Sequence, residues 1–414
     1  MRPAFRCGIL AFALAVLAGC GQREDGGGEP SDRWSVPHRL LLGRLDVLHV
    51  HLIQVDAVGL QPLEALLDRA DDAQPGRPAA AAPNVTPSGF GPTQLRSAYQ
   101  VTVDGSAANG GFGNTIAIVD AYGYANAEAD LAVYRSMYGL PACTTANSCF
   151  TKIDQNGGTA YPRYNSGWAQ EQALDLDMAS AICPKCKILL VQSSSATLAN
   201  LAKAVDTAGA RGALVISNSY GGGESGSSAY AGSYSKAGVA ITVSTGDSGY
   251  GAAFPATAPG VIAVGGTKLV ADATSPRGWK ETAWTSGGSG CSTVYGKPAW
   301  QGATGCANRM EADISAVADP ATGVAVYGPT GKGTQSGWLV FGGTSASAPI
   351  VGAIYGAYGV VANAAQHIWA APAGTFNDVT AGSNGTCTTA SFCNAGPGYD
   401  GPTGMGTPVG PNGL

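Results

Sequence analysis

Charged residues are scarce in this chain of 414 residues, where Asp, Glu, Lys and Arg together make up 12%. The net charge of −5 argues against a nucleic-acid partner, which would require a basic surface. The scarcity does not indicate disorder, because apolar residues reach 45% and glycine occurs 61 times. Length and composition together predict one large, loop-rich globular domain with an appendage.

Long hydrophobic runs are also missing after the N-terminus. Arg2 and Arg6 precede an apolar run, Cys7 to Ala18, which is too short to be a permanent membrane helix. The run ends in Leu17-Ala18-Gly19-Cys20, which resembles the lipobox of bacterial lipoproteins, where the cysteine becomes the lipidated first residue. Residues 1–20 are therefore predicted to be a lipoprotein-type signal peptide. The protein is expected to be exported, and to be outer membrane-anchored, periplasmic or extracellular in a bacterium. The alternative is ordinary cleavage near the same place, with Cys20 incidental.

Residues 21–93 are predicted to be a short tether, a pro-segment and a linker. Residues 21–32 are rich in Gly, Glu and Asp, residues 33–72 contain a Leu-rich segment, and residues 73–93 are rich in Ala and Pro. Cleavage in this linker would release a domain over residues 94–414. It would also remove any lipid anchor at Cys20, which is the only membrane attachment that we expect.

Eight cysteines follow the leader, and they fall in close pairs. An even count in an exported chain predicts a disulfide framework, although the spacing leaves the pairing open. Cys183 and Cys186 could instead form a redox or metal motif, but no second such pair and no histidine lies near them. The pairs of neighbours are Cys143/Cys149, Cys183/Cys186, Cys291/Cys306 and Cys387/Cys393.

Short apolar runs alternate with helical patterns, which predicts an α/β fold with a parallel sheet covered on both faces. The expected strands are 115–119, 188–191, 213–216, 239–243 and 261–264, and the expected helices are 127–137 (capped by Asn126), 168–182, 198–208 and 350–361. Residues 265–337 are expected to be mostly loop, with a hairpin-like pair ending at Leu339. The tail after His367 is expected to be irregular.

The stretch Gly342 to Pro349 joins a predicted strand to the last predicted helix. Its glycines allow a tight turn, and Pro349 is expected in the first helical turn, where its missing N–H has no cost. Ser345 is thereby presented at a helix N-terminus, where it would be either an attacking hydroxyl or a helix cap.

A serine nucleophile needs a base, and histidine is the usual one. Histidine occurs only 4 times, and all but His367 lie in the segment expected to be removed. A carboxylate is therefore the expected base. Glu171 and Asp175 are spaced i, i+4 on one helix face, where two carboxyls share a proton and separate their pKa values. A solvated helix face is the alternative, and Asp177 is expected to be structural or solvated.

Two further acids follow predicted strands, where active sites of parallel sheets form. Asp247 lies in Thr245-Gly246-Asp247-Ser248-Gly249 and either caps a helix or, when protonated, donates a hydrogen bond to an oxyanion. The second role requires acidic pH. Asp120 ends the first strand and, with no histidine nearby, is interpreted as structural.

Together these motifs resemble the sedolisins, the serine-carboxyl peptidases with a subtilisin-like fold, over about residues 95–410. The resemblance implies a three-layer α/β fold with a mainly parallel central sheet, and an endopeptidase that acts on protein or peptide substrates at acidic pH. It implies Ser345 as nucleophile, Glu171 as general base, Asp175 as its supporting acid and Asp247 as the oxyanion-stabilising acid. Ser219, Tyr220 and Gly221 resemble the family's substrate-flanking strand, which pairs with a peptide by strand addition.

The tail resembles the family's single calcium site, with oxygen ligands of the kind that Ca²⁺ prefers. The implied ligands are the side chains of Asp378 and Asp400 and the carbonyls of Val379, Gly396 and Gly398; a polar turn is the alternative. The pro-segment is much shorter than family members usually carry. A monomer is expected. Two rival functions remain, a catalytically silent surface-binding protein on the same fold and a neutral serine hydrolase that uses His367.

Overall fold

The computed structural model describes residues 87–103, 111–331, 335–359 and 364–414. All of them fall within one compact unit of the chain, Gln61–Leu414. The expected signal peptide, Cys20, the tether, the pro-segment and most of the linker lie outside the described residues. None of the described helices has the length and apolar character needed to cross a membrane.

The core of this unit is an eight-stranded sheet in the order β10-β6-β5-β4-β1-β3-β2, with β7 paired to β6. All neighbours are parallel except β6 and β7. The strands are β1 Thr115–Ala121, β2 Phe150–Asp154, β3 Lys187–Ser193, β4 Val215–Asn218, β5 Ala240–Ser244, β6 Ile262–Ala271, β7 Trp279–Ala283 and β10 Ile314–Val317. Two antiparallel pairs lie outside it, β8 Gly290–Gly296 with β9 Asn308–Glu311, and β11 Val324–Pro329 with β12 Ser336–Phe341.

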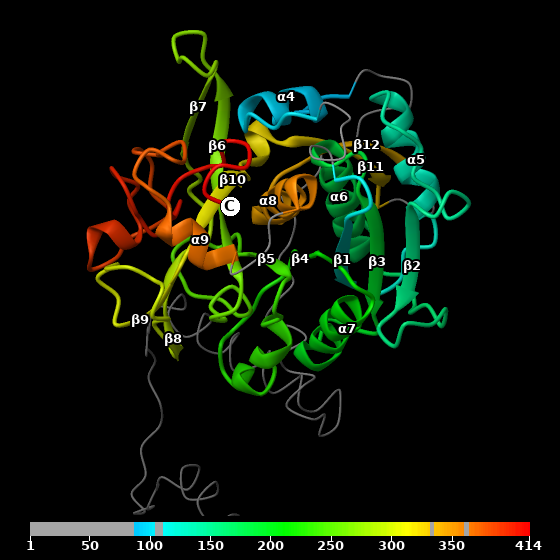
Figure 1. The fold of residues 1–414 in the computed structure, drawn as a ribbon, viewed down its shortest axis with the longest axis horizontal. Helices are drawn as coiled ribbons and strands as arrows, with labels where there is room; N and C mark the ends of the chain where they lie inside the picture. Colours follow the sequence, from blue (N-terminus) through cyan, green and yellow to red (C-terminus); the bar gives the residue numbers. More distant parts are fainter. Residues whose placement is uncertain (1–86, 104–110, 332–334, 360–363) are drawn as a thin grey trace, which may run out of the picture. The chain divides into compact units, whose positions relative to one another are not determined.

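Helices cover both faces of the sheet, so the predicted three-layer α/β fold is confirmed (Figure 1). Along β1, Ile116 and Ile118 pack in the same core cluster as residues of α6 and α8, whereas Ala117 and Val119 pack with residues of α7. This alternation is what a strand buried on both faces requires. The helices are α4 Pro92–Ala98, α5 Ala127–Met137, α6 Ser166–Ile182, α7 Leu198–Ala210, α8 Thr344–Tyr358 and α9 Ala364–Ala370.

The expectation of a mostly looped region over residues 265–337 was wrong. The region contains β7 to β11, and β10 extends the central sheet beside β6. Its strands carry buried charged side chains such as Glu281 and Arg309, so they lack the apolar pattern that marks a strand. The predicted hairpin is β11–β12, which ends two residues later than expected, at Phe341. The edge strand β2 was also not predicted, and Asn126 precedes α5 without making a side-chain cap.

The eight cysteines of the described residues form four disulfides, each between neighbours in the sequence. Cys183 and Cys186 are one of these pairs, so they are not a zinc site. The disulfide framework of the described domain therefore consists of short local cross-links, Cys143–Cys149, Cys183–Cys186, Cys291–Cys306 and Cys387–Cys393.

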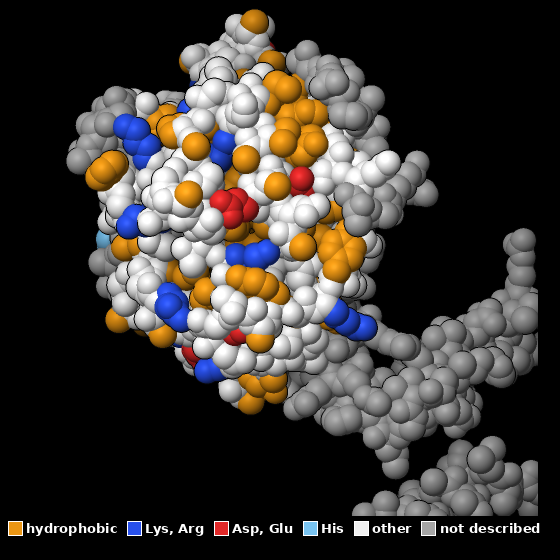
Figure 2. Space-filling view, turned by 90° about the vertical axis from the view of Figure 1, so that its right-hand side faces the viewer, with side chains coloured by type: hydrophobic (Ala, Val, Ile, Leu, Met, Phe, Trp, Pro, Cys, Tyr) orange, Lys and Arg blue, Asp and Glu red, His pale blue; other side chains and the backbone are white. Residues whose placement is uncertain are grey.

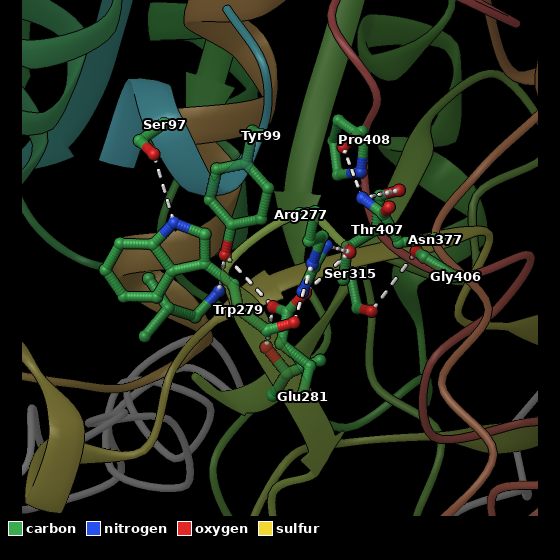
Figure 3. Close-up of polar contacts among 12 residues, drawn as sticks. Ser97, Tyr99, Arg277, Trp279, Glu281, Ser315, Asn377, Gly406, Thr407 and Pro408 are labelled. Carbon is green, nitrogen blue, oxygen red and sulfur yellow. Dashed lines mark hydrogen bonds and ion pairs between the residues drawn. The ribbon is translucent and has the colours of Figure 1, made fainter. Parts of the chain in front are cut away.

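Glu281 on β7 joins two segments that are distant in sequence, around Tyr99 and Thr407, to the neighbouring strands of the sheet (Figure 3). Its carboxylate accepts hydrogen bonds from Tyr99 (3.2 Å), Thr267 (2.6 Å) and Thr407 (2.6 Å), and pairs with Arg277 at 2.6 Å. The Tyr99 hydroxyl in turn accepts a bond of 2.7 Å from a main-chain N–H of β10. A single buried carboxylate thus fixes the start of the domain and its C-terminal tail to the sheet.

The surface agrees with the low content of charged residues. Figure 2 shows one face of the molecule, on which the Lys and Arg side chains are scattered among neutral ones. Among the described residues, the ion pairs on this sparse surface include Lys236–Asp206 and Lys268–Asp319.

Candidate active site

Ser345 lies at the second position of α8, and its side chain is almost completely buried. Gly343 precedes the helix with a φ of 102°, a conformation that disfavours any residue with a Cβ. The expectation that Pro349 lies in the first helical turn was wrong, because α8 begins at Thr344 and Pro349 lies in its second turn. Since proline has no N–H, the carbonyl of Ser345 loses its i+4 helical partner.

Helix α6 carries the two expected carboxylates toward this serine. Asn165 caps the helix by accepting the main-chain N–H of Trp168 at 3.1 Å, and α6 packs against α8. Glu171 and Asp175 are both buried, so they are not the solvated helix face of the alternative interpretation. Asp177 is buried as well and accepts the N–H of Tyr327 at 2.8 Å, which is a structural role.

Glu171 faces the serine hydroxyl and two other acids. Burial raises its pKa well above the ordinary range, the negative charges of Asp120 and Asp247 raise it further, and a hydrogen bond from Ser345 opposes them. Neither Glu171 oxygen makes a hydrogen bond of good geometry. The hydroxyl and the carboxyl are therefore neighbours whose bond is loose, as catalytic hydrogen bonds often are in the absence of substrate.

Asp120, at the carboxyl end of β1, completes the acidic group. Burial raises its pKa well above the ordinary range, and it raises the pKa of both Glu171 and Asp175. Neither of its oxygens has a hydrogen-bond partner among the described residues. Its packing against these acids goes beyond the structural role expected from the sequence. The signal that could have found it is its place at a strand end, where parallel sheets form their sites.

Asp175 differs from Asp120 and Glu171 because a neighbouring hydroxyl donates a well-formed hydrogen bond to its carboxyl. The hydroxyl of Ser219 donates to Asp175 Oδ1 at 2.8 Å, while Oδ2 has no partner among the described residues. Burial raises the pKa of Asp175 well above its ordinary value, Asp120 and Glu171 raise it further, and the bond from Ser219 lowers it.

Asp247 follows β5 and binds the turn before the nucleophile. Its Oδ1 accepts the N–H of Thr344 at 2.8 Å and the hydroxyl of Thr344 at 2.9 Å, while Oδ2 is buried and has no partner in the described part of the chain. A Cβ on Gly343 would come within 2.6 Å of that Oδ2. Burial raises the pKa of Asp247, and the bonds from Thr344 lower it. A protonated Oδ2 here would be a hydrogen-bond donor beside Ser345.

The C-terminal tail supports the loop that carries Asp247. The N–H of Tyr250 donates to the carbonyl of Asn384 at 2.9 Å. The side chain of Asn384 donates to the carbonyl of Gly287 at 2.7 Å and to the Ser289 hydroxyl at 2.8 Å. Gly288 in turn donates to the carbonyl of Gly246 at 2.7 Å. The segments around residues 247, 287 and 384 thus form one unit.

The predicted substrate-flanking segment leaves β4 beside these acids. Among the described residues, no main-chain hydrogen bond to another main chain involves Ser219, Tyr220 or Gly221, and the next residue pairs with Phe254. Their main chain is therefore suited to pair with a peptide. The side chains of Ser219 and Tyr220 are buried; Tyr220 binds Asn218 at 2.7 Å, so these side chains face the protein rather than a substrate.

The predicted calcium ligands come together in the tail. Asp378 and Asp400 accept main-chain N–H groups of Gly398 and Gly396, each at 3.0 Å. Burial raises the pKa of Asp400 to about 7, with a contribution from the nearby charge of Asp378. No described hydrogen bond ends on the carbonyl of Val379, Gly396 or Gly398. Among the described residues, no three His, Cys, Asp or Glu side chains are arranged so that they could hold a metal ion by themselves, so a metal here would depend on these carbonyls. The set of two carboxylates and three carbonyls fits a Ca²⁺ ion.

His367 is the single histidine of the described residues, and the structure does not bring it into the group around Ser345. It lies on α9, where its Nδ1 is 3.3 Å from the carbonyl oxygen of Leu414. The side chains that the structure records against Ser345 are the Glu171 carboxyl and the Ser219 hydroxyl.

Comparison with known proteins places this geometry in a wider context. The subtilase family matches residues 157–373. The chain is 30% identical over 372 residues to kumamolisin from a Bacillus species, and the matched region covers 79% of this chain and 63% of kumamolisin. It is 27% identical over 372 residues to sedolisin from a Pseudomonas species, covering 78% and 60% respectively. The chain thus spans less than two thirds of the length of either relative.

A solved structure of the Pseudomonas sedolisin, described as a serine-carboxyl proteinase complexed with two molecules of pseudo-iodotyrostatin, resembles the domain. The TM-score is 0.65 at 25% identity, covering 79% of this chain and 97% of the other. These similarities confirm the resemblance to sedolisins that the motifs indicated.

Proposed function

Since this chain belongs to the subtilase family and is similar to the sedolisins, we propose that it is a serine-carboxyl endopeptidase that hydrolyses peptide bonds at acidic pH. The observation that supports this most directly is the site itself. Ser345 stands at the start of α8, where its hydroxyl lowers the pKa of the neighbouring Glu171 carboxyl, and Gly343 just before the helix faces the Asp247 oxygen that has no partner among the described residues.

Each side chain has a role in the proposed reaction. The Ser345 hydroxyl attacks the scissile carbonyl carbon, and its proton passes to Glu171. The oxyanion that forms accepts hydrogen bonds from protonated Asp247 and from the N–H of Ser345, an early helix position without an intrahelical partner. Glu171 then protonates the leaving amine, and an acyl-enzyme remains on Ser345. Glu171 next takes a proton from the water that attacks this acyl-enzyme, and returns it to the Ser345 oxygen as the acid product leaves. Asp175 supports Glu171 through shared protons.

The proposed mechanism is restricted to acidic pH by Asp247. Its carboxyl donates a hydrogen bond only when protonated, and burial raises its pKa so that it stays protonated above the ordinary range. Activity should decline as the pH rises through that value. Glu171 must release its proton to act as base, so the activity also declines at the acidic extreme, and the profile is bell-shaped.

We further propose one Ca²⁺ ion, held by Asp378, Asp400 and the carbonyls of Val379, Gly396 and Gly398. When bound, the ion would neutralise two neighbouring carboxylates and cross-link the tail. We also propose export through residues 1–20, lipidation at Cys20, and maturation by cleavage of the linker at residues 73–93.

The test is replacement of the nucleophile in the purified full chain. The wild-type protein should cleave an unfolded protein substrate between about pH 3 and 6 with calcium present, and Ser345→Ala should cleave none. Ser347→Ala is a matched control, because it removes another buried hydroxyl of α8, bonded to the carbonyls of Ala316 and Val317.

Undiminished cleavage by Ser345→Ala would eliminate the proposed mechanism. An inert wild-type protein at every pH would favour the surface-binding alternative. His367→Ala should remain active, and loss of its activity would favour a histidine-based hydrolase.

A further inference from the structure

Ser219 has a side chain that the proposed reaction does not yet use. It follows β4 and is buried to 1% exposure between α6 and α8. Its hydroxyl oxygen lies 2.8 Å from Asp175 Oδ1 and 3.2 Å from the main-chain oxygen of Ser345. One hydroxyl therefore touches both the supporting acid and the main chain of the nucleophile.

The second contact exists because of Pro349. In a regular helix the carbonyl of Ser345 would accept the N–H of the residue four positions later, which here is Pro349. Proline has no N–H, so this buried carbonyl needs another donor. The Ser219 hydroxyl supplies one from a different element.

The first contact is equally dependent on Ser219. The titratable groups that face Asp175 are Glu171 on α6, Asp120 on β1 and the Tyr220 hydroxyl beyond β4. The charges of Glu171 and Asp120 disfavour ionisation of Asp175. The charge of Asp175 in turn disfavours ionisation of Tyr220. Ser219 is the neighbour that favours the ionised acid, and Asp175 Oδ2 has no partner among the described residues.

We propose that Ser219 is a positioning residue for hydrolysis at Ser345, whose hydroxyl holds the Asp175 carboxyl and the main chain of the nucleophile in one fixed arrangement. This inference rests on the proposed function. It adds a role of the side chain to the expectation that the main chain of Ser219 pairs with a peptide substrate.

A single hydroxyl proton gives this arrangement two forms. When Asp175 is ionised, the hydroxyl donates to Oδ1, and this charge-assisted bond is the shorter of the two contacts. When Asp175 carries a proton on Oδ1, the acid donates to Ser219, whose own proton turns to the Ser345 carbonyl. The hydroxyl thus couples the protonation of the acid to the turn that holds the nucleophile.

The experiment compares Ser219→Ala and Ser219→Thr in the full chain, with Ser345→Ala and Ser347→Ala measured alongside. Ser219→Ala should lower kcat by about ten- to a hundredfold, the usual effect of losing a bond to a charged group, and leave KM within about twofold. Its pH profile should move to higher pH, because the lost bond lowered the pKa of Asp175. Ser219→Thr, which keeps the hydroxyl, should restore kcat and the profile.

A double-mutant cycle with Asp175→Asn identifies the partner. If Ser219 acts through Asp175, the two losses in kcat should be far from additive. Should Ser219→Ala fold poorly, Ser219→Cys supplies a side chain of similar shape with a weak donor, and it should show the loss that Ser219→Thr does not.

The outcomes separate the two proposals. If the wild-type protein is active and Ser345→Ala is not, yet Ser219→Ala keeps the wild-type kcat, the positioning role is wrong and the function stands. A rise in KM alone, or a loss equal to that of Ser347→Ala with no shift of the pH profile, also overturns it. If the wild-type protein is inactive, or Ser345→Ala is as active as wild type, the proposed function itself fails.

Discussion

Asp247 holds Thr344, the residue before the nucleophile, by both its main-chain N–H and its hydroxyl, at 2.8 and 2.9 Å. One oxygen of the carboxyl is fully used by this contact, and the other stays buried and unpartnered beside Gly343. The acid is therefore fixed to the turn it would assist, so its free oxygen is preorganised for the oxyanion.

This arrangement predicts different effects for two substitutions of Asp247. Asp247→Ala removes the donor and should lower kcat by about 10²- to 10³-fold. Asp247→Asn keeps a donor that does not titrate, so its remaining activity should extend further toward neutral pH than that of the wild type. Initial rates on a peptide substrate over a pH series check both expectations. An Asp247→Asn profile that falls at the same pH as the wild type would contradict the role of Asp247.

Replacement of Asp120 should move the acidic limb of the pH profile. Asp120 raises the pKa of Glu171 and Asp175 by like-charge repulsion. In Asp120→Asn that repulsion is gone, so Glu171 should ionise at lower pH and the acidic limb should shift downward. The measurement is kcat against pH. An unchanged acidic limb would mean that Asp120 serves packing alone.

Stability should be greatest at acidic pH. Burial raises the pKa of Glu171, Asp175, Asp177 and Glu311 well above their values in an unfolded chain. At a pH between the pKa of such a group in the unfolded chain and its raised pKa in the folded protein, the folded protein binds more protons than the unfolded one. The free energy of unfolding therefore decreases as the pH rises through this range. Thermal unfolding of Ser345→Ala, from about pH 4 upward, should show a falling Tm. Asp177→Asn should flatten the slope, and a Tm that rises toward neutrality would refute this prediction.

The Glu281 network should make a large contribution to stability. Glu281→Gln leaves Arg277 without its anionic partner in a largely buried site, at an expected cost of about 3 kcal/mol in the free energy of unfolding. Lys268→Gln is the control, because its ammonium is exposed and lies 4.0 Å from Asp319, and it should cost less than about 0.5 kcal/mol. Denaturant unfolding measures the loss of unfolding free energy in both variants. Equal losses would show that the buried Glu281 network stabilises the fold no more than an exposed ion pair does.

Calcium should stabilise the domain independently of its activity. In the Ser345→Ala background, added Ca²⁺ should raise the Tm and a chelator should lower it, because the ion binds the folded state. Asp400→Asn should remove this dependence. Asp272→Asn, which changes an acid outside the tail that binds Thr274 of its own turn, should leave it intact. A Tm that does not respond to calcium or chelator would exclude the proposed site.

The positions of Glu171, Asp175, Asp247 and Ser345 could be predicted because short-range rules determine them. An i, i+4 spacing puts two acids on one helix face, and a glycine-rich junction puts a serine at a helix N-terminus. The part played by Asp120 could not be predicted from the sequence, because it depends on how β1 packs against α6. The inward direction of Ser219 could not either, because it depends on a carbonyl that Pro349 leaves without a donor.

The strands β7 to β10 illustrate the same limit for the fold. Some of them carry buried polar side chains whose partners are distant in sequence, as Glu281 does with Tyr99 and Thr407. Local apolar periodicity identifies strands that are buried against helices, such as β1 and β3, and misses strands that depend on side-chain networks.

The contact of Asn384 with the loop around Tyr250 has a consequence for biosynthesis. Residue 384 is made after almost every other part of the domain, yet the loop that bears Asp247 rests on it. A nascent chain that ends before this asparagine lacks the hydrogen bonds that support that loop. We therefore expect the proposed active site to be complete only near the end of synthesis.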